Sequence, residues 1–150
     1  MVCTFFGHRE TPATIKQILR ENVVQLIENE NVDRFYVGNH GAFDRMVYAV
    51  LTELSEVYPI SFFVVLAYLP SYEETDSEHT ILPDGIESVP RRFAITYRNN
   101  WMLRRSDYVL GYVTHDAGSG AVVFLKRAEK LKKHVILLPT NGKDQFRIPF

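Results

Sequence analysis

Cysteine is almost absent from the 150-residue sequence, which contains only Cys3. No disulfide can form within the chain, so the class of small disulfide-stapled proteins is excluded. Long apolar runs are also missing, and residues 1–6 are too short for a signal segment and carry no basic flank. We therefore expect a cytoplasmic protein with no membrane partner.

An excess of one charge sign is missing too: 17 Lys and Arg face 18 Asp and Glu, a formal net charge of −1. Whole-chain electrostatics therefore do not indicate a nucleic-acid or membrane partner. The five histidines are scattered without the paired spacing of a metal site. We expect no metal and no required cofactor, and we expect Cys3 to be a small core residue, since no nucleophile pattern surrounds it.

Short apolar runs alternate with amphipathic stretches along the chain. This pattern predicts βαβ units and a Rossmann-like, three-layer α/β/α fold with a mostly parallel central sheet of about five strands, in a single domain spanning residues 1–150. The expected strands are 2–6, 34–37, 61–67, 108–113 and 135–138, and the expected helices are 12–27, 42–57, 91–105 and 121–133. Residues 68–90 are interpreted as a long surface loop.

Two helices carry more specific expectations. Thr11 and Pro12 fit the N-cap and first position of the first helix. In the helix 91–105, an apolar face is expected from Phe93, Ala94, Tyr97 and Trp101. Arginines recur there at positions 91, 98 and 105, and a solvated face is the interpretation we favour for most of them, with a nucleic-acid patch as the alternative.

Three loops should meet at one rim of the sheet, because parallel strands present their carboxyl ends at the same edge. They are residues 7–11, 38–44 and 114–120. The second and third are glycine-containing and open helices, so backbone N–H groups and a helix dipole could hold a phosphate. Ser119 could cap its helix or donate to that phosphate. The alternative is that the glycines only form tight turns.

The first loop adds side-chain chemistry. Arg9 is a candidate phosphate or ribose ligand, because a guanidinium binds oxyanions with two parallel hydrogen bonds; the alternative is a solvated arginine. His8 could titrate near neutral pH, but the sequence assigns it no carboxylate partner, so a general-base role has little support.

A family resemblance emerges from several motifs taken together. They are Thr4-Phe5-Phe6-Gly7-His8-Arg9, Tyr36-Val37-Gly38-Asn39-His40-Gly41-Ala42-Phe43-Asp44, Val65-Leu66-Ala67-Tyr68-Leu69-Pro70, Arg98-Asn99-Asn100-Trp101-Met102, Ser106-Asp107-Tyr108-Val109 and Thr114-His115. Across nearly the whole chain they resemble the YpsA-like branch of the SLOG superfamily. The resemblance implies a Rossmann-like fold, a nucleotide-derived ligand and a homodimer or larger assembly. Trp101 and Tyr97 could lie at its interface or in the core.

The resemblance to the LOG phosphoribohydrolases of that superfamily is only partial. Arg98 and Met102 match their Arg-Lys-x-x-Met segment, and Gly118-Ser119-Gly120-Ala121 matches part of Pro-Gly-Gly-x-Gly-Thr-x-x-Glu. The proline is missing, and Val123 and Phe124 stand where acidic residues are expected. In those enzymes a glutamate there is implicated in N-glycosidic cleavage. The departure favours binding over catalysis, with Asp44 and Asp116 as the remaining candidate acids.

Three functions follow from these observations. The first is binding, or sensing, of a nucleotide or nucleotide-sugar at the rim. The alternative is hydrolysis of the N-glycosidic bond of a nucleoside monophosphate, with Arg98 positioning phosphate or ribose. The third is a nucleic-acid-linked role like that of DprA, another SLOG member. The predicted ligand-binding residues are Gly7, His8, Arg9, Gly38, Asn39, Gly41, Asp44, Arg98, Thr114, Gly118, Ser119 and Gly120.

Overall fold

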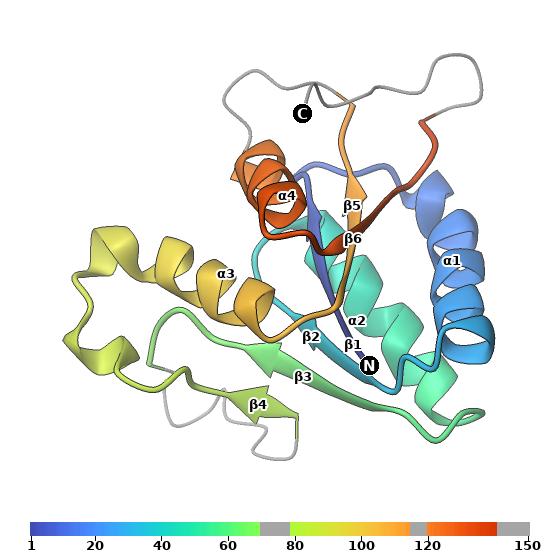
Figure 1. Cartoon of the computed structure of the whole chain (residues 1–150), viewed down its shortest axis with the longest axis horizontal. Helices are drawn as coiled ribbons and strands as arrows, with labels where there is room; N and C mark the ends of the chain where they lie inside the picture. The colour runs from blue at the N-terminus through green and yellow to red at the C-terminus, as the bar shows by residue number, and fades with distance from the viewer. Residues whose placement is uncertain (70–78, 115–119, 141–150) are drawn as a thin grey trace.

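The chain folds around a parallel sheet whose strands run in the order β4-β3-β2-β1-β5-β6 (Figure 1). The computed structural model describes residues 1–69, 79–114 and 120–140. Every strand pair is parallel. The strands are β1 (Val2–Gly7), β2 (Arg34–Val37), β3 (Ser61–Val65), β4 (Thr80–Ile81), β5 (Tyr108–Tyr112) and β6 (His134–Leu137).

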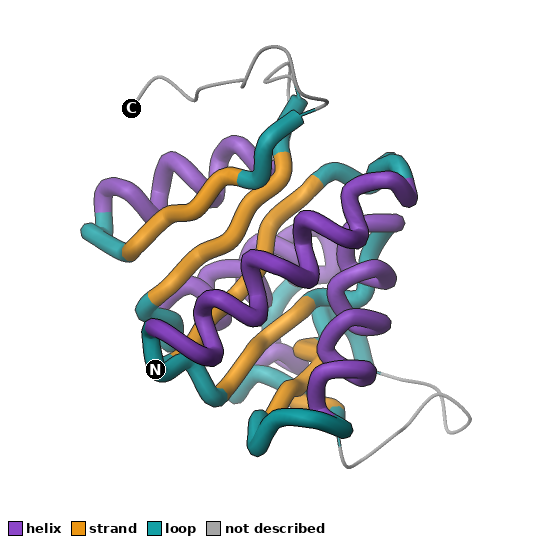
Figure 2. The backbone as a smooth tube through the Cα atoms, turned by 90° about the vertical axis from the view of Figure 1, so that its right-hand side faces the viewer, coloured by secondary structure: helices purple, strands orange, loops and turns teal. Residues whose placement is uncertain are grey.

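Helices cover both faces of the sheet (Figure 2). They are α1 (Lys16–Asn29), α2 (Ala42–Ser55), α3 (Ala94–Arg104) and α4 (Gly120–Lys130). Side chains of α1 and α2 share one core cluster, and those of α3 and α4 share another. The predicted three-layer α/β fold is therefore confirmed.

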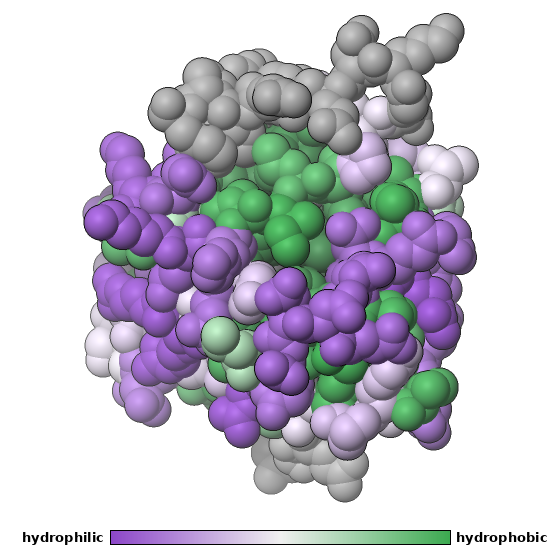
Figure 3. All heavy atoms as spheres, turned by 45° about the vertical axis from the view of Figure 1, so that its right-hand side comes forward, coloured by the Kyte–Doolittle hydropathy of each residue, from purple (hydrophilic) through white to green (hydrophobic). Residues whose placement is uncertain are grey.

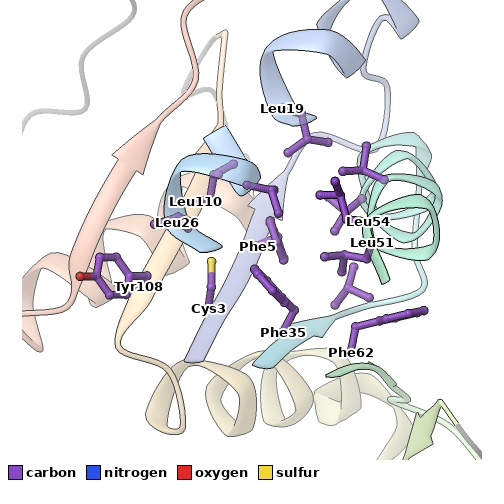
Figure 4. Close-up of a cluster of buried hydrophobic side chains, with 14 of the residues drawn as sticks. Cys3, Phe5, Leu19, Leu26, Phe35, Leu51, Leu54, Phe62, Tyr108 and Leu110 are labelled. Atoms are coloured by element: carbon purple, nitrogen blue, oxygen red, sulfur yellow. The ribbon is translucent and has the colours of Figure 1, made fainter. Parts of the chain in front are cut away.

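Alternation along the strands separates these two cores. In β1, Cys3 and Phe5 face α1 and α2, whereas Phe6 faces α3 and α4. Leu51 and Leu54 of α2 are fully buried in the first core (Figure 4). Cys3 is buried there as predicted, and burial raises the pKa of its thiol well above the ordinary value.

The strand order sets where a ligand can bind. Strands β1 to β4 are added in one direction, and the chain then crosses to β5, on the other side of β1. The helices that follow β1 and β5, α1 and α4, lie on opposite faces of the sheet. The carboxyl ends of the strands leave room for a ligand at such a switch point.

The sheet has a strand more than the five expected. Residues 80–81, inside the stretch interpreted as a surface loop, form β4 at the edge beside β3. A two-residue strand is too short to produce a sequence signal, and pairing with β3 decides its conformation. The same stretch contains a short 3₁₀ helix, η2 (Ile86–Ser88).

The start of the first helix also differs from the prediction. A 3₁₀ turn, η1 (Ala13–Ile15), precedes α1, and no side chain caps either element. Instead of capping, the Thr11 hydroxyl donates to the carbonyl oxygen of His8 over 2.7 Å. Thr11 thereby fastens the loop after β1 rather than the helix.

The face that Figure 3 shows is mostly hydrophilic, with an apolar recess in it. Within residues 1–69, 79–114 and 120–140, no helix combines the length and the apolar character needed to cross a bilayer.

Candidate functional site

A pocket of about 540 Å³ opens at the carboxyl ends of the central strands. Its volume falls within the range of small-molecule sites. Loops after β1 and β2 contribute to its lining, together with α3 and the N-terminus of α4. The lining residues are Phe5, Phe6, Gly7, His8, Arg9, Glu10, His40, Asp44, Ile95, Arg98, Asn99, Met102, Gly120 and Ala121.

The first two rim loops are joined by backbone contact. The N–H of Ala42, at the start of α2, donates to the carbonyl oxygen of Arg9 over 2.7 Å. Gly41 has φ of +94°, and a Cβ there would lie 2.6 Å from the Cα of Arg9. Only glycine fits this left-handed, crowded position, so the glycine fixes how the Arg9 loop meets α2.

His8 links the loop after β1 to the end of β5. Its ring is largely buried, and its Nε2 accepts a hydrogen bond from the backbone N–H of Thr114 over 3.0 Å. Because an amide N–H can only donate, Nε2 carries no proton. Since its lone pair is already engaged, this nitrogen is poorly suited to a general-base role.

Arg98 is the main departure from the sequence prediction for helix 91–105. Its side chain is only 2% exposed, whereas a solvated face was favoured for most of these arginines. Ile95, Arg98, Asn99 and Met102 follow i, i+3, i+4, i+7 spacing and line the pocket together. The expected apolar face is confirmed in part: Ala94 is buried and Tyr97 and Trp101 pack against core clusters, whereas Phe93 is exposed. Met102 and Leu103 are buried in addition.

Hydrogen bonds explain how this arginine can be buried. Its Nη1 donates to the carbonyl oxygen of Val65 over 2.9 Å and to Asn39 Oδ1 over 3.3 Å. Its Nε donates to Asn99 Oδ1 over 2.7 Å, and its Nη2 donates to His40 Nδ1 over 3.2 Å. Four of the five guanidinium N–H donors are thus engaged within the protein. Arg98 connects α3 to β3 and to the loop after β2.

Asp44 lies in the first turn of α2, half-buried at the pocket. Its Oδ2 accepts the backbone N–H of His40 over 3.0 Å. Burial raises the pKa of Asp44 to about 6, against the opposing effects of this hydrogen bond and of Arg98. The carboxyl therefore changes charge close to neutral pH.

Gly38 allows Asp44 and Arg98 to converge. A Cβ at this position would lie 2.8 Å from Asp44 Oδ2 and 3.0 Å from Arg98 Cζ. A methyl group there would displace one of the two charged groups. The glycine at the end of β2 therefore has a steric role in shaping the pocket.

His40 also lines the pocket, although its sequence context did not predict it as a ligand-binding residue. Burial, and then the positive charges of Arg98 and Arg9, lower the pKa of its imidazole. Its ring meets the ring of Tyr68 edge-on, with centroids 5.9 Å apart. The signal that could have found it was its position between Asn39 and Gly41, directly after a strand.

The site residues predicted from the sequence fall into three groups. Six line the pocket: Gly7, His8, Arg9, Asp44, Arg98 and Gly120. Gly38, Asn39, Gly41 and Thr114 contact those residues or support their loops. Asp116, Gly118 and Ser119 lie outside the described residues.

The other arginines predicted on this face of helix 91–105 are exposed to solvent, as expected. Arg91 lies over the ring of Tyr68 at 4.2 Å, and Arg105 lies over the ring of Trp101 at 4.0 Å. Both guanidinium groups are exposed. Trp101 is half-buried and meets Tyr36 edge-on, so it belongs partly to the core.

Chemically, the pocket combines an apolar wall with charged groups at a helix N-terminus. Phe5, Phe6, Ile95 and Met102 form the apolar part, and the charges come from Arg9, Arg98, Asp44 and Glu10. In the described part of the chain, no group of three or more His, Cys, Asp or Glu residues could hold a metal ion.

No protein-family model matches the sequence, and no curated protein matches it. Among solved structures, the fold is similar to that of DNA processing protein A from Helicobacter pylori, which is described as binding single-stranded DNA in a unique mode. The TM-score is 0.65 at 15% identity, covering 97% of this chain and 68% of that chain. At this identity the two proteins share a fold, and the chain is an α/β protein of Rossmann-like architecture.

Proposed function

We propose that the rim pocket binds a nucleotide or nucleotide-sugar. The observation that carries the proposal is the convergence, on one pocket, of Arg9, the N-terminal turns of α2 and α4, and an apolar wall. Helix N-termini and a guanidinium attract phosphate, while an apolar wall accommodates a base. These features explain binding and do not require the protein to catalyse a reaction on the ligand.

The two kinds of lining suggest how such a ligand would lie. Arg9 is exposed at the mouth of the pocket and its backbone contacts the start of α2, so phosphate groups suit this side. Ile95 and Met102 of α3 present aliphatic groups that suit the face of a base. Four donors of Arg98 are already bonded within the protein, which makes it a support for the pocket more than a free phosphate ligand.

Membership of the YpsA-like branch of the SLOG superfamily is part of this proposal. It is supported by the motifs of the sequence: Gly7-His8-Arg9, the segment from Gly38 to Asp44, and Arg98 with Met102 all contribute to one pocket. Assembly into a homodimer is a further expectation of that membership, and sedimentation equilibrium would test it by the mass of the particle.

The binding proposal is tested by calorimetry with AMP, ADP-ribose, NAD and other nucleoside monophosphates. Replacing Arg9 with Ala should weaken binding of the best ligand by about tenfold, because a charge-assisted hydrogen bond is lost. Arg20→Ala is the matched control, since Arg20 lies on α1 beside Glu53 and does not line the pocket. Failure of the wild-type protein to bind any member of the panel at millimolar concentration would refute the proposal.

Hydrolysis of an N-glycosidic bond is a second candidate, favoured by one observation. Asp44, with its pKa raised to about 6, can be present as a proton donor near neutral pH. Release of free base from AMP would reveal the activity. Unchanged release by Asp44→Asn and by Asp116→Asn would exclude both carboxylates as the acid.

Single-stranded DNA binding is a third candidate, favoured by the fold shared with DNA processing protein A. Exposed arginines over aromatic rings, such as Arg91 on Tyr68 and Arg105 on Trp101, suit a nucleic-acid strand. Fluorescence anisotropy with a labelled oligonucleotide tests this role. Affinity that falls steeply with salt supports it, and an undetectable or salt-insensitive signal removes it.

A further inference from the structure

His40 is held in place from three directions. Its backbone N–H donates to Asp44 Oδ2 over 3.0 Å, and its Nδ1 lies 3.2 Å from Arg98 Nη2. Its ring also meets Tyr68 edge-on, with an interplanar angle of 88°. Because the backbone and the ring of His40 are both held, the side chain has a defined orientation before any ligand arrives, and such preorganisation is typical of residues that contact ligands.

The contact with Arg98 fixes the tautomer of the imidazole. A guanidinium has only N–H donors, so Nδ1 of His40 must be the acceptor and cannot carry a proton. The ring proton therefore lies on Nε2. Protonating Nδ1 as well would break this bond and place a second positive charge beside Arg98, and the lowered pKa of His40 agrees with a neutral ring.

The other ring nitrogen of His40, Nε2, is not used by the hydrogen bond to Arg98. His40 lines the pocket, and Nε2 has no hydrogen-bond partner among the described residues. The ring can offer an N–H donor from this atom and no acceptor. A matching ligand group must therefore be an acceptor, and the nearby charges of Arg98 and Arg9 favour one that is anionic.

We propose that the Nε2–H of His40 donates a hydrogen bond to a phosphate oxygen of the bound ligand, and that Arg98 is the positioning residue that fixes this tautomer. The inference rests on the proposed nucleotide-binding function and sharpens it. Part of the affinity must come from phosphate at His40, so the ligand class is a phosphorylated nucleoside rather than a nucleoside.

Two substitutions of His40 separate the roles of its nitrogens. Glutamine can place an amide N–H near the position of Nε2, whereas asparagine reaches only the position of Nδ1. Calorimetry with AMP should show that His40→Asn weakens binding by about tenfold and that His40→Gln stays within about threefold of wild type. Adenosine, which lacks the phosphate, should bind wild type and His40→Asn equally.

The tautomer itself is read without ligand. Long-range ¹H–¹⁵N spectra of the wild-type protein near neutral pH should show His40 protonated at Nε2 only. In Arg98→Lys, the ammonium group cannot hold an N–H donor against Nδ1 of His40 as the planar guanidinium does, so the spectrum of His40 should move toward a mixture of tautomers. A purely structural role of Arg98 would not change this signature, and far-UV circular dichroism checks that the variant is folded.

The outcomes distinguish the inference from the proposed function. If wild type binds AMP but His40→Asn binds it equally well, or if wild-type His40 is protonated at Nδ1, the inference is wrong and nucleotide binding stands. If wild type binds no nucleotide, the proposed function fails and the donor role of His40 fails with it. Loss in His40→Asn, retention in His40→Gln and an Nε2–H tautomer together support the inference.

Discussion

Two buried regions of the molecule are held together differently. The core beneath α1 and α2 is packed from apolar side chains, whereas the pocket at the carboxyl ends of the strands is held by hydrogen bonds. In the core, Leu51 and Leu54 of α2 pack against strand residues such as Phe5 with no exposed surface or almost none. At the pocket, Arg98 is just as buried, but its side chain forms hydrogen bonds to β3, to the loop after β2 and to its own helix.

The difference shows what each region contributes. Apolar contacts of the core are non-directional, so they stabilise the fold without fixing any single polar geometry. Hydrogen bonds of Arg98 are directional, and they fix the places of Asn39 and His40 to within bonding distance. Stability should therefore respond most to changes in the core, and ligand affinity should respond to changes at the pocket.

The largest loss of stability should come from the core. Leu51→Ala removes a fully buried side chain and should lower the free energy of unfolding by about 3 kcal/mol. Nucleotide affinity of the folded fraction should stay at the wild-type value. Urea denaturation and calorimetry measure the two quantities, and a matching drop in affinity would contradict the separation.

Arg98→Met should affect both quantities. Methionine preserves much of the volume but leaves the buried carbonyl oxygen of Val65 and the Nδ1 of His40 without their donor. We expect the free energy of unfolding to fall by about 2 kcal/mol and nucleotide affinity to fall at least tenfold. Wild-type affinity in a folded variant would show that the network does not shape the site.

Gly38→Ala should disturb the pocket by crowding. The added methyl group would lie 2.8 Å from Asp44 Oδ2, so stability should fall by about 1 to 2 kcal/mol and affinity should weaken. Gly120→Ala is the matched control, because no atom lies within 4 Å of a Cβ placed there. Equal effects of the two substitutions on stability would contradict the steric explanation.

The pH dependence of stability should carry the signature of Asp44. Its pKa is about 6 in the folded protein and 3.8 ordinarily, so the folded state binds more protons between these values. The free energy of unfolding therefore gains from this group as pH falls through 6, and the gain is complete below 3.8. Asp44→Asn should remove this dependence and stabilise the protein near neutral pH, on the order of 1 kcal/mol after solvent screening. Parallel pH profiles for variant and wild type would contradict the raised pKa.

The smallest effect is expected at the exposed arginines. Arg105→Ala removes an exposed guanidinium from the ring of Trp101, which is worth at most about 0.5 to 1 kcal/mol. Nucleotide affinity should not change, whereas oligonucleotide affinity and its salt dependence should fall if this surface binds DNA. Thermal denaturation, calorimetry and anisotropy on one preparation would test all three expectations.

Much of the fold could be predicted because its signals are local. The apolar runs that became β1, β2 and β5 lie within a residue of their expected bounds, and α2 begins at the expected Ala42. The missed strand β4 has only two residues and depends on its partner β3. The capping role of Thr11 was wrong because its hydroxyl bonds to His8, a contact that the shape of the loop decides.

The sequence by itself determined the alternation of strands and helices and the gathering of glycine-containing loops at one rim, because periodicity and strand direction follow from neighbouring residues. Only the tertiary structure decided that Arg98 is buried, that His40 offers a proton from Nε2 and that Asp44 titrates near 6. Each of these properties depends on atoms brought together from distant parts of the chain, including the carbonyl oxygen of Val65. Every residue has such a carbonyl group, so no sequence pattern could single this one out.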